Sequence, residues 1–128
     1  MIQRLHHIAI ICSDKEKTIR FYQTLGFSVI EFRPRQDRGD EIVFMECCGT
    51  VLELFIEHNR PLRLTYPEAY GLRHIAFSVD NLSDTCKELH SAGYDLDPIR
   101  KDMRTDEAMT FVKDPDGLPI ELREKIKK

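Results

Sequence analysis

The sequence predicts an α+β fold made of two tandem βαβββ modules, whose strands form a curled mixed sheet, or cup, with the helices outside. One observation behind this prediction is an internal repeat, in which residues 7–27 match residues 74–94 and begin with the same His-Ile-Ala. The other is that the strand and helix patterns follow the same order in both copies. The 128 residues are therefore expected to form a single domain. Its modules span about 5–57 and about 72–124, with a linker over about 58–71.

Each module opens with a strand pattern followed by a short helix pattern. The two strands, "HHIAIIC" and "RHIAFSV", are rich in β-branched and aromatic residues. Ser13 and Glu16 have capping-box spacing and predict the start of the first helix, and Asp80 or Ser83 could cap the second. Each helix pattern ends at a glycine, the residue that most readily adopts the left-handed conformation found there: Gly26 and Gly93.

Three further strand patterns complete each module, and the repeat continues through them. In the aligned modules Phe44 matches Phe111, and Glu53 matches Glu121. One extra residue falls in the turn "DPDG" of the second module, where a hairpin tolerates it. The expected strands cover these ranges: about 27–33, 41–46, 51–57, 95–100, 108–113 and 118–124.

Strand alternation places one histidine and one glutamate of each module on the face that points away from the helix. His7 alternates with the apolar Ile8, and Glu53 lies between two leucines. The same alternation holds for His74 and Glu121. A single histidine in an apolar strand is more often a well-packed core residue, but here histidine and glutamate recur together. Two imidazoles and two carboxylates suit Zn, Ni, Co, Fe or Mn.

Composition excludes several classes of function. The net charge is -3, with 19 Lys plus Arg against 22 Asp plus Glu, which gives no electrostatic support for nucleic-acid binding. No apolar run approaches the roughly 18 residues of a membrane span, and the first residues lack a signal-peptide pattern. The four cysteines contain no C-x-x-C pair and suggest free thiols. We therefore expect a cytoplasmic protein without a membrane or nucleic-acid partner.

Residues 5–124 resemble the vicinal oxygen chelate superfamily, also called the glyoxalase/bleomycin-resistance/dioxygenase superfamily. The resemblance lies in "HHIAI", "VLELF", "LRHIAFSVDNL" and above all "DPDGLPIEL". The His-Glu-His-Glu set is most similar to glyoxalase I (lactoylglutathione lyase) and to small bacterial glyoxalase-like proteins. The resemblance implies one divalent metal ion, Zn or Ni first and Co, Fe or Mn as alternatives. It also implies these ligands: His7, Glu53, His74 and Glu121.

The same resemblance implies an activity and a partner. A lyase or isomerase would act on a small carbonyl compound or its thiol adduct through a metal-bound enediolate, with Glu121 as the first choice of base and Glu53 as the second. A homodimer is expected, and the metal site could form within one chain or between two. Alternatives are a metal-dependent epimerase acting on an acyl thioester, a thiol transferase, and a non-enzymatic small-molecule-binding resistance module.

Two positions depart from glutathione-dependent relatives, and no substrate-binding residue is identified. Ile11 stands where bacterial glyoxalases commonly have an arginine, and Glu57 stands where they often have an asparagine. We expect Glu57 to repel a glutathione carboxylate, and hence weak use of the glutathione adduct.

Overall fold

The structure is a computed structural model that describes residues 1–126. The chain divides into two compact units, Met1–Leu62 and Arg63–Lys128. No helix among the described residues is long and apolar enough to cross a membrane. The elements in chain order are β1 (Ile8–Cys12), α1 (Lys15–Thr24), β2 (Ser28–Arg35), β3 (Asp40–Cys47), β4 (Thr50–Ile56), β5 (Ile75–Val79), α2 (Leu82–Ser91), β6 (Arg100–Lys101), β7 (Ala108–Lys113) and β8 (Pro119–Glu124).

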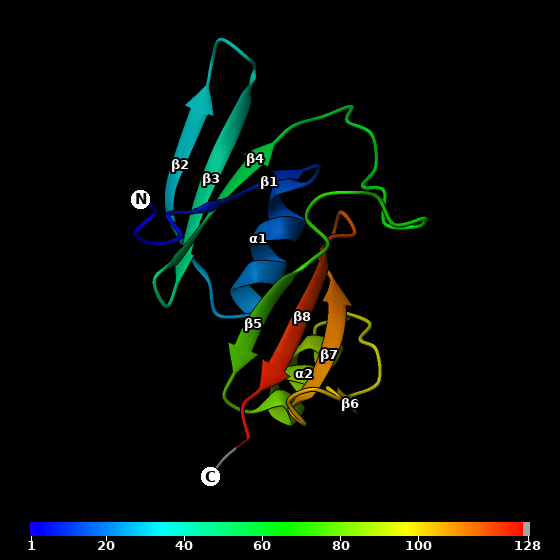
Figure 1. The fold of residues 1–128 in the computed structure, drawn as a ribbon. Coiled ribbons are helices and arrows are strands. Elements are labelled where there is room, and N and C mark those ends of the chain that lie inside the picture. The colour runs from blue at the N-terminus through cyan, green and yellow to red at the C-terminus, as the bar shows by residue number, and fades with distance from the viewer. Residues whose placement is uncertain (127–128) are drawn as a thin grey trace. The chain divides into compact units, whose positions relative to one another are not determined.

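Each unit contains one four-stranded mixed sheet, and the two sheets have the same topology (Figure 1). The strand orders are β1-β4-β3-β2 and β5-β8-β7-β6. The first strand of each unit pairs in parallel with the last, and the remaining pairs are antiparallel. The α+β class and the repeated βαβββ order predicted from the sequence are thereby confirmed.

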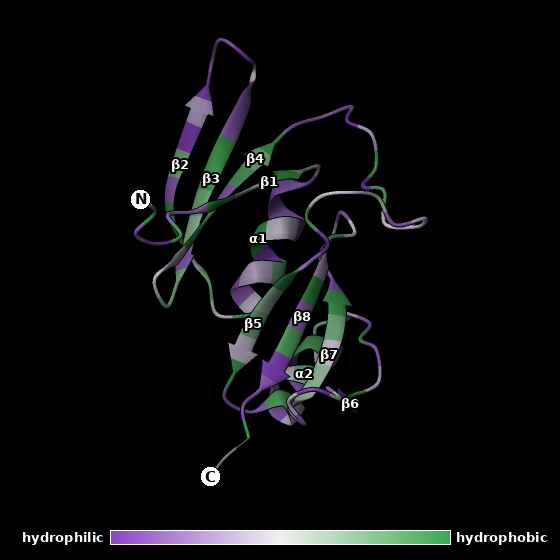
Figure 2. Ribbon diagram, in the orientation of Figure 1, coloured by the Kyte–Doolittle hydropathy of each residue, from purple (hydrophilic) through white to green (hydrophobic). Residues whose placement is uncertain are grey.

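Alternation along the strands separates a buried face from a polar one in each sheet. In β4 the side chains of Leu52 and Leu54 are fully buried, whereas Glu53 between them is only partly covered. In β8 the fully buried Ile120 and Leu122 flank Glu121, which is itself buried. Figure 2 shows the hydrophobic residues concentrated in the central strands, while the tip of the β2–β3 hairpin is hydrophilic. The core therefore occupies one face of each sheet and leaves the glutamates on the other.

The helices begin one residue away from two of the predicted caps. Asp14, not Ser13, caps α1, because its carbonyl accepts the first helical bond and its carboxylate accepts from the amide of Lys17 at 3.0 Å. Asn81, rather than Asp80 or Ser83, caps α2 by accepting from the amide of Asp84 at 2.9 Å. A side chain caps a helix only from the residue whose carbonyl starts the bond ladder. The predicted ends were correct, since Gly26 and Gly93 have φ of 111° and 96°.

The strand predicted over residues 95–100 is wrong for most of its length. Only Arg100–Lys101 forms β6, and Leu96 makes an isolated bridge to Val112. Pro98 has no amide hydrogen to donate to a ladder. The segment attaches instead through Asp97, whose amide donates to the Phe111 carbonyl at 3.0 Å and whose carbonyl accepts from the Thr110 hydroxyl at 2.6 Å.

Candidate metal centre

Glu53 and Glu121 occupy equivalent positions in the sheets of the two units. Glu53 in β4 lies opposite Ala9 of β1 on one side and opposite Phe44 of β3 on the other. Glu121 in β8 lies between Ala76 of β5 and Phe111 of β7. Each glutamate is thus in a central strand, flanked by a small residue and by an aromatic one. The small alanine leaves room above it for the histidine two residues earlier on the same strand face.

In the first unit His7 and Glu53 form a close pair. His7 directly precedes β1, and its Nε2 lies 3.0 Å from Oε2 of Glu53. The side chains are 37% and 18% exposed, so the pair is accessible but not fully solvated. His6 precedes the strand as well, which frees it from strand alternation. Its Nδ1 lies 2.9 Å from Nδ1 of His7, and the two rings meet edge to face. The imidazole of His7 is therefore contacted through both ring nitrogens.

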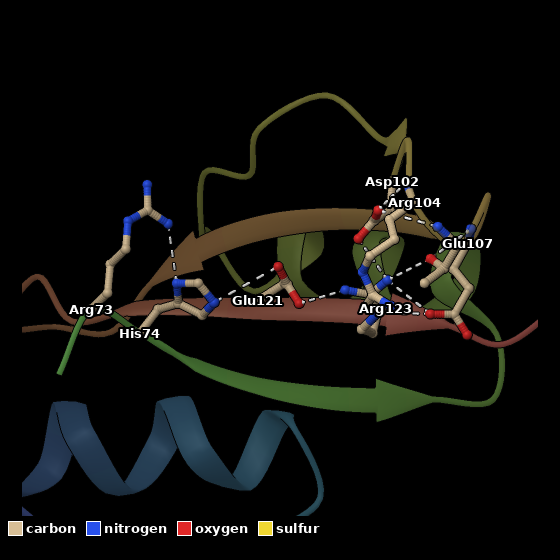
Figure 3. A network of polar contacts seen from close by, with 8 residues as sticks. Arg73, His74, Asp102, Arg104, Glu107, Glu121 and Arg123 are labelled. Carbon is tan, nitrogen blue, oxygen red and sulfur yellow. Dashed lines mark hydrogen bonds and ion pairs between the residues drawn. The ribbon is translucent and has the colours of Figure 1, made fainter.

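The second unit repeats the pair with His74 and Glu121. The Nε2 of His74 lies 3.8 Å from Oε1 of Glu121 (Figure 3). The His74 ring meets Phe111 edge to face, with the ring centroids 5.1 Å apart. Arg73 lies 3.3 Å from Nδ1 of His74 and can only donate to it. A metal ion on Nε2 of a neutral imidazole needs the proton on Nδ1. Metal binding through Nε2 would therefore break the contact with Arg73.

Glu121 has a further partner that Glu53 lacks. The Nη1 of Arg123 donates to Oε2 of Glu121 at 3.1 Å. The rest of the guanidinium binds the connection between β6 and β7, where it donates to Asp102, Thr105 and Glu107 (Figure 3). The hydrogen bonds to the carboxylates of Asp102, Glu107 and Glu121, with Asp102 first, raise the pKa of Arg123. Arg123 is thus a permanent cation next to a predicted ligand.

Arg123 was not among the residues predicted from the sequence, although its spacing from Glu121 is a signal for it. Arg123 follows Glu121 by two residues in a strand, and strand alternation puts the two side chains on one face. What the sequence did not show is that residues 102–107 fold back to meet it. Asp102 starts this turn by accepting from the amide of Arg104 at 2.7 Å, and this bond and the one from Arg123 lower the pKa of Asp102.

The predicted quartet is present as two pairs, one in each unit. Within residues 1–126 no group of three or more His, Cys, Asp or Glu side chains is arranged to hold a metal ion. Each pair nevertheless offers one imidazole nitrogen and one carboxylate oxygen directed toward each other, a donor set that suits a divalent transition metal. The residues of each unit therefore fit half of a four-ligand site.

The structure changes the interpretation of one of the two departures from glutathione-dependent relatives. The Glu57 side chain is 8% exposed and lies 2.8 Å from Nε of Arg60 and 3.6 Å from Nη2 of Arg35. Its charge is compensated by these arginines, so the structure gives no support for the expected repulsion of a glutathione carboxylate. Ile11 is 55% exposed and lies on the same face of β1 as Ala9. Ile11 therefore occupies an accessible position, where an arginine side chain could reach a ligand but an isoleucine offers no charge.

The repeated strand and helix order agrees with a family comparison. Residues 4–122 match the glyoxalase/bleomycin resistance protein/dioxygenase superfamily. The chain belongs to this superfamily. A Bacillus subtilis relative, YwkD, is 47% identical over 97% of this chain and 98% of its own. The crystal structure of a glyoxalase family protein from Enterococcus faecalis is 40% identical, covers 95% of this chain and 98% of that one, and superposes with a TM-score of 0.88.

Two other relatives within the superfamily have names that state a reaction. A protein of Vibrio cholerae called "Probable lactoylglutathione lyase" is 30% identical over 93% of this chain and 88% of its own. The mitochondrial methylmalonyl-CoA epimerase of Homo sapiens is 34% identical over 67% of this chain and 52% of its own. The superfamily thus includes enzymes of more than one reaction class.

Proposed function

We propose that the protein is a divalent-metal-dependent lyase or isomerase of the glyoxalase type, acting on a small carbonyl compound or its thiol adduct. The observation that supports this proposal is the repetition of the His–Glu pair at the same strand register in both units, with Nε2–Oε distances of 3.0 and 3.8 Å. The backbone pairing of the strands does not by itself require a histidine and a glutamate at these positions in both units. A metal-binding function gives a reason for both copies.

In this proposal His7, Glu53, His74 and Glu121 hold one ion, Zn or Ni first and Co, Fe or Mn as alternatives. When bound, the ion would act as a Lewis acid for negative charge that develops on a substrate oxygen. The two histidines would bind as neutral imidazoles and keep the ion in place. One of the carboxylates would take the proton from the carbon next to the carbonyl, and a positioned base of this kind contributes about 10²–10⁴-fold to the rate.

A homodimer belongs to the proposal. In each sheet the first and second strands of the unit form the edges, and such edges are commonly covered by a partner. The edge strand β2 exposes Ile30 and Phe32, which are 58% and 52% exposed. The two His–Glu pairs of one metal site would come from one chain or from the two chains of the dimer.

The test begins with metal content. Purified protein analysed by plasma mass spectrometry should carry about one divalent ion per chain, as a four-ligand site requires. His74→Ala should lose the ion, whereas the matched control His58→Ala should retain it, because His58 is exposed and lies outside both pairs. Protein that contains no divalent ion after growth with added Zn and Ni would contradict the proposal.

The second part of the test identifies the substrate. Methylglyoxal is offered with glutathione, bacillithiol, coenzyme A or no thiol, to protein loaded with Ni or with Zn. Turnover of one adduct that disappears in His74→Ala supports the lyase or isomerase. The relation to methylmalonyl-CoA epimerase favours an acyl-thioester epimerase as the second candidate. Exchange of the α-proton of an acyl-CoA without lyase activity would decide for that candidate.

A further inference from the structure

We propose that Arg123 is a positioning residue that fixes Glu121, so that the two carboxylates of the site have different tasks. Glu121 stays a fixed ligand, and Glu53 is the carboxylate that moves and takes the proton. This assignment rests on the proposed function and reverses the order of bases that the sequence resemblance implies.

The guanidinium of Arg123 is bound on all sides. Its Nη1 donates to Oε2 of Glu121 at 3.1 Å, and its Nε donates to Oε1 of Glu107 at 2.9 Å. Its Nη2 donates to Oδ2 of Asp102 at 3.0 Å and to the hydroxyl of Thr105 at 2.9 Å (Figure 3). The side chain is 19% exposed. Because every nitrogen has a partner, Arg123 has little freedom to follow a carboxylate that moves away.

The contact with Arg123 leaves Glu121 one free oxygen. Oε2 accepts the bond from Arg123, while Oε1 faces Nε2 of His74. The Glu121 side chain is only 10% exposed, so water cannot easily replace a lost partner. Release of Glu121 from a bound ion would also break a charge-assisted hydrogen bond, which is among the stronger contacts in proteins. This arrangement suits a carboxylate that binds through one oxygen and stays in place.

The repeat provides an internal comparison, because Glu53 occupies the same register in the first unit. The residue two positions after Glu53 is Phe55, where Arg123 follows Glu121. Among residues 1–126 the Glu53 carboxylate has one polar partner, His7. The first unit does contain an arginine near this place, since Arg35 stacks on the Phe55 ring at 4.9 Å.

Arg35, however, serves other carboxylates. Its Nε and Nη2 bind the two oxygens of Asp40 at 2.7 and 2.8 Å, and Nη2 lies 3.6 Å from Glu57. The backbone register is the same in the two units, so the side chain two residues after the glutamate accounts for the difference. Glu53 can therefore leave a bound ion without breaking a charged contact, and Glu121 cannot.

The experiment separates positioning from fold stability by comparing Arg123→Gln with Arg35→Gln. The two arginines are equally exposed, at 19%, and each binds carboxylates, but only Arg123 contacts a predicted ligand. Metal-free protein is titrated with Zn²⁺ or Co²⁺. We expect Arg123→Gln to lose about 10–100-fold in metal affinity, the usual effect of removing the partner of a ligand. Arg35→Gln should bind as the wild type does, and Arg123→Lys should recover part of the loss because it keeps the charge.

Hydrogen exchange supplies a readout that needs no metal and no substrate. Residues 102–107 should exchange faster in Arg123→Gln than in Arg35→Gln, because Arg123 fastens this segment to β8. Glu107→Gln, which loosens the guanidinium without touching Glu121, provides a milder variant if Arg123→Gln unfolds. It should show a smaller loss of metal affinity. Metal affinity equal to that of the wild type in folded Arg123 variants would overturn the positioning role.

The division of tasks is tested by exchanging each carboxylate for an amide. Glu53→Gln should keep the ion and lose at least about 10²-fold in turnover, as expected for a missing base. Glu121→Gln should mainly weaken metal binding. The reverse pattern, with turnover lost in Glu121→Gln at full metal occupancy and kept in Glu53→Gln, would overturn the assignment. Wild-type protein that binds no divalent ion would instead refute the proposed function, and the assignment with it.

Discussion

At the scale of single side chains, two positions bear on which thiol adduct the proposed site would accept. The residues at positions 11 and 57 suggested poor use of glutathione, and after the structure only the argument from Ile11 remains. Glu57 is buried and paired with Arg35 and Arg60, so it presents no uncompensated charge. Ile11 is exposed on β1 and offers no hydrogen-bond donor. The missing cation, rather than an added anion, is therefore the reason to expect weak recognition of glutathione.

Adding that cation tests this explanation. We expect Ile11→Arg to raise kcat/KM for the methylglyoxal–glutathione adduct by about 10–100-fold, since a hydrogen bond to a charged group contributes about 1.5–3 kcal/mol. Ile11→Glu serves as the charge-reversed control and should not improve it. The measurement is the rate with glutathione at matched metal occupancy. A wild-type kcat/KM above about 10⁵ M⁻¹s⁻¹ with glutathione, an ordinary enzyme value, would show that no arginine is needed.

Among the elements, the two units differ most in the strand that follows the helix. β2 has eight residues, whereas β6 has two. The shortened strand leaves residues 102–107 free to form a turn, held by the amides of Arg104 and Thr105 on the carboxylate of Asp102. This turn supplies the partners of Arg123. The short strand in the second unit thus has a structural consequence, because the turn that replaces it binds the guanidinium of Arg123 beside Glu121.

The helix α2 offers a clean test of the observed cap. Asn81→Ala should lower the free energy of unfolding by about 1 kcal/mol, because the amide of Asp84 loses its acceptor. Ser83→Ala, at the cap position that the sequence suggested, should change it by less than about 0.5 kcal/mol, as is usual for an exposed site. Urea unfolding followed by circular dichroism measures both variants. A larger effect from Ser83 would place the cap there after all.

At the scale of the molecule, the repeat gives two sheets with one topology and one His–Glu pair each. Neither pair suffices for a tightly bound ion, since structural and catalytic transition-metal sites use at least three protein ligands. The proposed site therefore requires the two kinds of unit to meet, within one chain or across a dimer.

The proposed dimer has a direct test. Light scattering at micromolar concentration should give a mass about twice the 15.0 kDa of the chain, as is common for closed two-fold assemblies. Repeating the measurement with His74→Ala tells whether the ion is needed for association. A wild-type protein that remains at 15.0 kDa under these conditions would contradict the dimer.

The sequence by itself determined the α+β class, the repeated βαβββ order and the face on which Glu53 and Glu121 lie. These features follow from local periodicity, because side chains alternate along a strand whatever the rest of the fold does. It could not determine the partners of Arg123 or of Glu57. These partners include residues far apart in the chain, and only tertiary packing brings Arg123 within 3.0 Å of Asp102 and Glu57 within 3.6 Å of Arg35. The helix caps were likewise decided by the residue at which each hydrogen-bond ladder begins. The short β6 reflects packing together with the missing amide hydrogen of Pro98.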